Sequence, residues 1–272
     1  MKAARCPTLA SVGHLGVFCE KMKYWNAYLR YWENIGGRYF MVAGIAFIVF
    51  YILLRVIARN KKIQHKYPAI KDYAREIGYS VMTISIFSLI PVIFVINPVI
   101  SPHTTMYRNI ADYGMVYYIF AYPLMFVMHD TYFYWVHRLM HHKNIFPYFH
   151  LVHHQSTNPS PWAAYAFHPL EAVVEAGIFI IFLFTIPMHT SHFYIFFFLS
   201  IIYNVYGHLG WELYPKGFSK SFIGKWINTS VNHNQHHQHF KGNYGLYFLF
   251  WDRLMGTIRK DYDQKFEEVK RR

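Results

Sequence analysis

Seven histidines fall within one stretch of 26 residues, HDTYFYWVHRLMHHKNIFPYFHLVHH at 129–154, which continues an apolar run. A second dense group, HNQHHQH at 233–239, follows much later in the chain. Neutral imidazole is a good ligand for iron, zinc, copper and nickel. The two groups therefore predict a metal site, provided that the fold brings them together.

The composition is that of a membrane protein. Of the 272 residues, 54% are hydrophobic and only 15% are charged, whereas a soluble domain usually carries about 25% charged residues. The net charge of +13 raises nucleic-acid binding as an alternative, but the basic residues lie beside apolar segments, as membrane topology requires. Cys6 and Cys19 are the only cysteines, so neither a disulfide framework nor a cysteine metal site is expected. We expect an integral membrane protein with no nucleic-acid partner.

Apolar runs predict the membrane-spanning segments. Residues 39–58 and 77–100 each approach the roughly 20 residues that a spanning helix needs, and Pro91 predicts a kink in the second. A third span, about 113–135, leads directly into the first histidine group. Residues 172–206 are apolar apart from an interruption at 187–190 and predict a tight helical hairpin.

The predicted fold is an all-α integral membrane protein with about four transmembrane helices and a histidine-rich helical cap. Residues 1–110 would form N-terminal membrane helices, and residues 111–272 a catalytic region that makes one structural unit with them. The basic loop 59–75 should stay in the cytoplasm, because short Lys/Arg-rich loops do so. Following the spans from that loop brings 137–170 and 208–272, with both histidine groups, to the cytoplasmic face.

The spacing of the histidines indicates more than one metal. Residues at i and i+3 or i+4 share a helix face, so each group is predicted to aim two or three nitrogens at one point. Eight histidines exceed the needs of one four-coordinate zinc and predict two metals. A ninth lies where the hairpin returns to the cytoplasmic face. The candidate ligands are His137, His141, His150, His153, His154, His208, His233, His236 and His237.

Other polar residues are expected to support these ligands. Asp130 lies on the same helical stripe as His137 and His141, and it is predicted to accept a hydrogen bond from a ligating imidazole. The alternative is a pairing of Asp130 with Arg138 or a backbone group. Glu171 is expected to play a similar supporting role, and His168 and His239 to surround the metals.

At these histidines the chain resembles the sterol desaturase / fatty acid hydroxylase superfamily of integral-membrane enzymes with two irons. The pattern H-x3-H, H-x2-H-H and a late H-x2-H-H matches His137 and His141, then the groups that start at His150 and His233. The sterol 5-desaturase (lathosterol oxidase) branch is resembled by longer strings: HDTYFYWVHRLMHH, FHLVHHQSTNPSPWAAYAFHPLE and NYGLYFLFWDRLMGTIR.

The resemblance implies an O2-dependent desaturase or hydroxylase that oxidises an unactivated C–H bond of a lipid, most similar to a sterol ring desaturase. It implies two Fe ions bound by the histidines, with Zn a possible occupant of purified protein. Electrons would come from a separate donor, such as cytochrome b5, a ferredoxin or a reductase, because the chain has no heme domain or nucleotide fingerprint. The enzyme would reside in the endoplasmic reticulum of a eukaryote or the inner membrane of a bacterium.

An apolar substrate should enter from the lipid. Aromatic side chains that would line its route, or alternatively form an interfacial belt or pack the bundle, are Trp135, Trp162, Tyr165, Phe167 and Trp211. Three further functions stay open at this stage. They are a fatty acid or sphingolipid hydroxylase of the same superfamily, a membrane zinc hydrolase, and a metal transporter. The absence of H-E-x-x-H disfavours the usual zinc protease.

Overall fold

The first two helices are longer than the apolar runs that predicted them. The computed structural model describes residues 13–272, so Cys6 lies outside it. Helix α1 (Gly13–Phe47) continues as a π-helix to Leu53, and α2 (Ile70–Pro91) continues as a π-helix over Val92–Ile96. The change to π-helix directly follows Pro91, which has no N–H to donate within the helix.

Two helices of the described chain are long and apolar enough to cross a membrane, Glu20–Leu53 and Ile70–Ile96. The expected third span is helical as α3 (Gly114–Met140). The expected hairpin is present as α6 (Pro169–Glu175), α7 (Gly177–Thr185) and α8 (Thr190–Gly207). A nine-residue helix such as α7 is only about 14 Å long. The structure thus bears out a mostly helical protein with two candidate membrane spans, and the total of four spans stays a prediction.

The hairpin turn is fastened to the segment that precedes α3. Strand β2 (Met188–His189) pairs in parallel with β1 (Met106–Tyr107). The outgoing arm breaks at Ala176, between α6 and α7. There the hydroxyl of Tyr132 donates to the carbonyl of Val174 at 2.6 Å. The same hydroxyl occupies the space that a Cβ on Gly177 would need, at 2.3 Å, so a side chain at the start of α7 would displace the Tyr132 hydroxyl.

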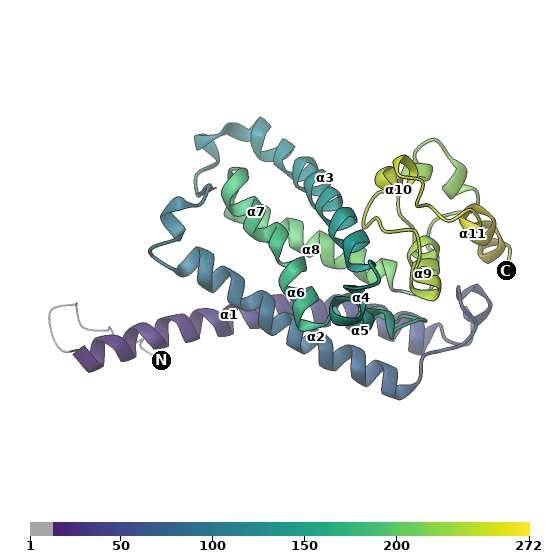
Figure 1. The fold of residues 1–272 in the computed structure, drawn as a ribbon, viewed down its shortest axis with the longest axis horizontal. Helices are drawn as coiled ribbons and strands as arrows, with labels where there is room; N and C mark the ends of the chain where they lie inside the picture. The colour runs from purple at the N-terminus through teal and green to yellow at the C-terminus, as the bar shows by residue number, and fades with distance from the viewer. Residues whose placement is uncertain (1–12) are drawn as a thin grey trace.

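Short helices form a cap at one end of the long ones (Figure 1). The α-helices of the cap are α4 (Phe146–Phe149), α5 (Leu151–His154), α9 (Ser230–His239), α10 (Phe250–Leu254) and α11 (Tyr262–Arg271). Single turns of 3₁₀-helix occur at Arg59–Lys61, Ser101–His103, Ile110–Asp112, Pro161–Tyr165, Phe218–Lys220 and Gly224–Trp226.

The basic loop packs against this cap. The backbone N–H of Ile63 donates to the carbonyl of Gly210 at 2.9 Å, and the side-chain amide of Gln64 donates to Asn234 Oδ1 in α9 at 2.9 Å. The loop between α1 and α2 and the histidine-bearing cap therefore lie at the same end of the long helices. Whatever compartment holds one of them holds the other.

Candidate metal centre and adjoining cavity

Nine buried or half-buried histidines form two adjoining clusters. The first has five, and the second has four, with the ligand atoms in each cluster within 4.8 Å of one another. Rings of different clusters also adjoin, since the centroids of His154 and His237 are 4.9 Å apart. The five-histidine cluster is His137, His141, His150, His154 and His236, and the four-histidine cluster is His153, His208, His233 and His237.

Each H-x-x-H-H motif is divided between the two clusters, which corrects the expectation that every motif aims at one point. Pairs at i and i+4, such as His150 with His154 or His233 with His237, stay in one cluster. The i+3 member of each motif, His153 or His236, joins the other cluster. Positions i+3 and i+4 differ by about 100° around a helix, which separates their side chains enough to serve two points.

Hydrogen bonds to carbonyl oxygens fix which ring nitrogen carries the proton. A carbonyl only accepts, so a histidine Nδ1 facing one must donate its N–H, and the Nε2 then carries a lone pair. His208 Nδ1 donates to Asn204 O at 2.8 Å, and His237 Nδ1 donates to Ser156 O at 3.0 Å. In the five-histidine cluster, His137 and His236 donate in the same way to Tyr244 O and Gly242 O.

The Nε2 lone pairs converge at distances that hydrogen bonding alone does not explain. In the four-histidine cluster, Nε2 of His208 lies 3.0 Å from that of His233 and 3.1 Å from that of His237. The lone pairs of His208 and His237 therefore face each other without a proton between them. Two imidazoles bound at right angles to a first-row metal, with bonds of roughly 2.1 Å, would hold their nitrogens about 3.0 Å apart. The donor set thus fits a bound metal cation.

Burial keeps these histidines neutral, as metal binding requires. Burial lowers the pKa of His150 and His153 well below the usual value, and neighbouring imidazoles lower it further. The pKa values of His236 and His237 are lowered for the same reason. Near pH 7 the rings are therefore uncharged.

Helix α9 is polar in sequence yet buried from Ser230 to His237. Its N-terminus is capped by the hydroxyl of Thr229, which accepts from Asn232 N at 3.2 Å. Its C-terminus leads into Gly242, whose positive φ of 78° turns the carbonyl toward His236. A Cβ on Gly242 would also lie 2.5 Å from Thr257 O. Burying such a helix costs free energy unless its polar groups have partners, and a metal centre supplies them for the imidazoles.

Glu171 supports the five-histidine cluster as predicted. Its carboxylate accepts the Nδ1 proton of His150 at 2.6 Å, and both side chains are buried. His168 lies at the N-cap of α6, where its Nδ1 accepts from Leu170 N at 3.3 Å. It therefore contributes to the start of the helix that carries Glu171 and bonds none of the nine histidines.

Asp130 acts differently from the prediction. Within the part of the chain that the structure describes it bonds no imidazole, and one carboxylate oxygen accepts the backbone N–H groups of Tyr247 at 2.7 Å and Phe248 at 3.0 Å. The structure therefore shows the alternative in which Asp130 pairs with backbone groups. Asp252 accepts from the neighbouring N–H groups of Tyr244 and Gly245. The two carboxylates fix the loop whose Tyr244 carbonyl orients His137, so Asp130 affects a candidate ligand only through the backbone.

Two further buried carboxylates hold backbone near the clusters. Glu76 in α2 accepts from the hydroxyls of Ser156, at 2.7 Å, and Ser160. The carbonyl of that same Ser156 accepts from His237. Glu212 accepts from Val231 N, at 3.0 Å, near the start of α9. Sequence analysis predicts no role for Glu76. The one feature that could have indicated a role is the position of this charged residue close to an apolar run.

His239 does not meet the expectation that it surrounds the metals. It is the last residue of α9 and is exposed, as is His142, which follows α3. One turn earlier on α9, His236 points inward. His239 is held away because the chain leaves the helix at Phe240, which has a left-handed φ of 63°.

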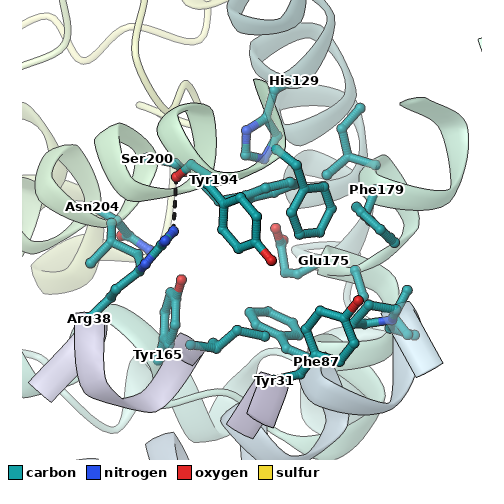
Figure 2. A pocket seen from close by; sticks show the side chains of 18 of the residues that line it. Tyr31, Arg38, Phe87, His129, Tyr165, Glu175, Phe179, Tyr194, Ser200 and Asn204 are labelled. Carbon is teal, nitrogen blue, oxygen red and sulfur yellow. Dashed lines mark hydrogen bonds between the residues drawn. The ribbon is translucent and has the colours of Figure 1, made fainter. Parts of the chain in front are cut away.

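An apolar cavity lies beside both clusters. It is open at one side, has a volume of about 120 Å³, and is lined by α1, α2, α3, α6, α7 and α8. Its inner wall touches the histidines: the rings of Phe133 and His137 are 4.9 Å apart, and those of Phe167 and His153 are 5.2 Å apart. Figure 2 shows its side chains, including Tyr31 and Arg38 from α1, around the open space.

Two of the five aromatics expected along a substrate route line this cavity, Tyr165 and Phe167. The three tryptophans pack elsewhere. Trp135 stacks edge-on against Trp251 and is 44% exposed. Trp162 packs against the Tyr39 ring, and Trp211 is buried beside Tyr51. Their role is packing, which was the alternative for each.

Comparison with known proteins agrees with this site. The model of the fatty acid hydroxylase family matches residues 122–257, which include every histidine of both clusters. The chain belongs to the fatty acid hydroxylase family. No solved structure matches it.

Relatives within this family include sterol desaturases. A Delta(7)-sterol 5(6)-desaturase of Gibberella zeae is 31% identical over 225 residues, covering 80% of this chain and 68% of that protein. One from Aspergillus fumigatus is 30% identical over 258 residues, covering 91% and 70%. Rat lathosterol oxidase is 29% identical over 188 residues, covering 68% and 61%. Other matches span as little as 42% of the relative. The resemblance to the sterol desaturase branch is confirmed.

Proposed function

We propose that this chain is a membrane-bound, O2-dependent oxidoreductase with two irons that introduces a double bond into a sterol ring. The observation that carries the proposal is the pair of histidine clusters, whose lone pairs converge beside an apolar cavity. Such a site has nitrogen ligands suited to a redox metal and a place for a water-insoluble substrate. The family and its named sterol-oxidising relatives support the same reaction.

Each group of residues has its own part in the reaction. The bound irons would activate O2 and remove hydrogen from an unactivated C–H bond, which acid–base side chains cannot do. The nine histidines hold the metals while staying neutral, and the carbonyls and Glu171 fix their tautomers. The apolar wall, with Phe133 and Phe167 next to the histidines, excludes water and holds the substrate against the centre.

The balance of atoms and electrons in the reaction shows which other reactants the enzyme needs. Desaturation removes two hydrogens from the lipid, and O2 is reduced to two waters with two further electrons and two protons. Those electrons come from a separate donor, such as cytochrome b5, a ferredoxin or a reductase. The substrate enters from the bilayer, because Tyr31 and Arg38 of the cavity wall belong to the first candidate span.

The active site faces the cytoplasm in this proposal. The basic loop between α1 and α2 contacts the cap, and such loops stay on the cytoplasmic side. The membrane would be the endoplasmic reticulum in a eukaryote or the inner membrane in a bacterium.

Hydroxylation of a fatty acyl chain or another lipid is the second candidate, because the matching family model is that of fatty acid hydroxylases. The two reactions share the first hydrogen removal and differ in the product. A zinc hydrolase is less well supported, since Glu171, the carboxylate bonded to a cluster histidine, is engaged with His150.

The test is turnover by full-length, iron-loaded protein in lipid nanodiscs, with ferredoxin, its reductase and NADPH as the electron source. Lathosterol should be converted to the 5,7-diene with matching O2 consumption. The control is His142→Ala, at an exposed histidine. A hydroxylated lipid in place of a diene would favour the second candidate. Zinc as the only metal, with no O2 consumed on any lipid, would overturn the redox function.

A further inference from the structure

We propose that Glu175 is the group that binds the hydroxyl of the lipid substrate, at the inner part of the cavity beside the metal centre. Glu175 lines the cavity at the C-terminal end of α6. Figure 2 shows its carboxyl group directed into the open space. The hydroxyl-binding role depends on the proposed function for the identity of its ligand, a sterol, and deepens it by naming the residue that sets the substrate's orientation.

Glu175 has no protein partner among residues 13–272: no hydrogen bond or ion pair to its carboxyl group occurs there. Two other polar side chains of the wall have protein partners. Arg38 donates to Tyr194 O at 2.9 Å, and Asn204 donates to Ala164 O at 2.8 Å. Leaving a carboxyl group unpaired in an apolar cavity costs free energy. A ligand with a hydrogen-bonding group would satisfy it.

The position of Glu175 is set by the metal-supporting helix. Four residues earlier on α6, Glu171 bonds His150 of the five-histidine cluster. Four residues of α-helix rise roughly 6 Å, so the Glu175 backbone follows that of Glu171 by that distance along the helix axis. The break at Ala176 and the Tyr132 bond to Val174 O fix the end of α6. Glu175 therefore lies near the metal centre on a rigid element.

A hydroxyl-binding group close to the metals fits a reaction in which the oxidised carbon lies only a few bonds from the hydroxyl. In a sterol, the hydroxyl-bearing C3 is two bonds from C5, one of the carbons joined by the new double bond. Holding that hydroxyl on Glu175 would bring the polar end of the sterol in first and leave its hydrocarbon tail toward α1. A substrate oxidised far from its polar end would instead need its polar group bound at the mouth.

Ligand discrimination tests this role. The probes are lathosterol and its 3-deoxy analogue, together with hexadecanol and hexadecane. Binding to the full-length, iron-loaded protein in nanodiscs is followed by displacement of a fluorescent sterol. The variants are Glu175→Leu, Glu175→Gln and, as a matched comparison, Tyr165→Phe. Tyr165 also lines the cavity, and its hydroxyl forms no hydrogen bond within residues 13–272.

Wild type should bind lathosterol roughly ten- to hundredfold more tightly than the deoxy analogue, because the deoxy analogue would leave the buried carboxyl group of Glu175 without a hydrogen-bond partner. Glu175→Leu should abolish this ratio without weakening the deoxy analogue, and Glu175→Gln should leave an intermediate ratio. Tyr165→Phe should keep most of the wild-type ratio between the two affinities. Metal content and thermal melting of each variant confirm that the fold is intact.

An unchanged ratio in Glu175→Leu, or its loss in Tyr165→Phe alone, would overturn the assignment to Glu175. Failure of the sterol proposal has a different outcome. Wild type would then bind neither sterol, and the comparison of hexadecanol with hexadecane would decide the role of Glu175. Discrimination that depends on Glu175 would support a hydroxyl-binding site for another lipid, and discrimination independent of Glu175 would overturn it.

Discussion

The two histidine clusters are built from the same motifs but supported differently. The five-histidine cluster contains His141, which is half-buried, and it includes the only one of the nine, within the described chain, that donates to a carboxylate, His150. The four-histidine cluster is fully buried. There His208 and His237 donate to neutral backbone carbonyls.

This difference shows what each cluster requires of the fold. A carboxyl group that accepts a proton from an imidazole raises the basicity of that imidazole, so the five-histidine cluster has a side-chain support that a substitution can remove. The four-histidine cluster depends on the backbone of α8 and of the loop after α5, and on His208, which belongs to none of the three motifs. A substitution in the support of one cluster should therefore weaken metal binding at that cluster and leave the other cluster unaffected.

The largest effect is expected for the four-histidine cluster. His208→Ala removes the imidazole whose Nε2 lies within 3.3 Å of three others. Turnover should fall by roughly a thousandfold or more, about 4 kcal/mol of lost transition-state stabilisation. Steady-state O2 consumption measures it, with the exposed His142→Ala as the control. Turnover within a fewfold of wild type would remove His208 from the centre.

The second largest effect is expected for Glu171, whose carboxyl group bonds the five-histidine cluster. Glu171→Gln keeps the size of the side chain but replaces the carboxyl group that accepts the Nδ1 proton of His150. Metal affinity of the five-histidine cluster should fall roughly 10- to 100-fold, and the other cluster should keep its iron. Titration with a chelator should show one iron released early and one at the wild-type concentration. Equal early release of both irons would show that the clusters are not independent.

The next effect in size is expected from the protonation of any one histidine, which makes the free energy of unfolding depend on pH. Burial lowers the native pKa of His237, while an unfolded histidine titrates near pH 6.5. Below that pH the unfolded state binds a proton that the native state does not. The free energy of unfolding therefore falls with acidification, by up to about 1.4 kcal/mol per pH unit for this residue.

His237→Gln should make this dependence shallower. The measurement is the urea midpoint of metal-free protein in detergent from pH 7 to pH 5.5, for wild type and variant. Parallel pH profiles for the two proteins would show that His237 is not neutral and buried in the metal-free protein.

The smallest effect should come from His239→Ala, one turn beyond the ligands of α9. Because His239 is exposed, its replacement should change the free energy of unfolding by less than about 0.5 kcal/mol and leave turnover and iron content unchanged. Loss of iron in this variant would mean that α9 ends differently from the structure described here.

Sequence reasoning predicted which histidines lie together better than it predicted how they are arranged. Spacing at i and i+4 identified His137 with His141, and the position of His208 at the end of the hairpin identified the ninth histidine. The division of each motif between two clusters did not follow, because it depends on how α5 and α9 face each other. The carbonyls of Tyr244 and Gly242 carry no side-chain signal at all.

The supporting carboxylates show the same limit. A supporting role was predicted for Glu171 because it ends the histidine-containing stretch AFHPLE, whereas the partner of Asp130 was predicted wrongly. Asp130 was placed correctly on its helical stripe, but the loop at Tyr247 packs against its carboxylate. A buried carboxylate accepts hydrogen bonds from the nearest unpaired backbone N–H groups. Helix extent was also only partly predictable, since the first helix continues through polar residues well before the apolar run begins.

The most direct test of the two-cluster centre is iron stoichiometry in protein purified from iron-replete cells. Wild type should carry two irons per chain, and His141→Ala and His208→Ala, one from each cluster, should each retain about one. One iron in the wild type, or complete loss of iron in both variants with the fold intact, would contradict two separate metal positions held by the nine histidines.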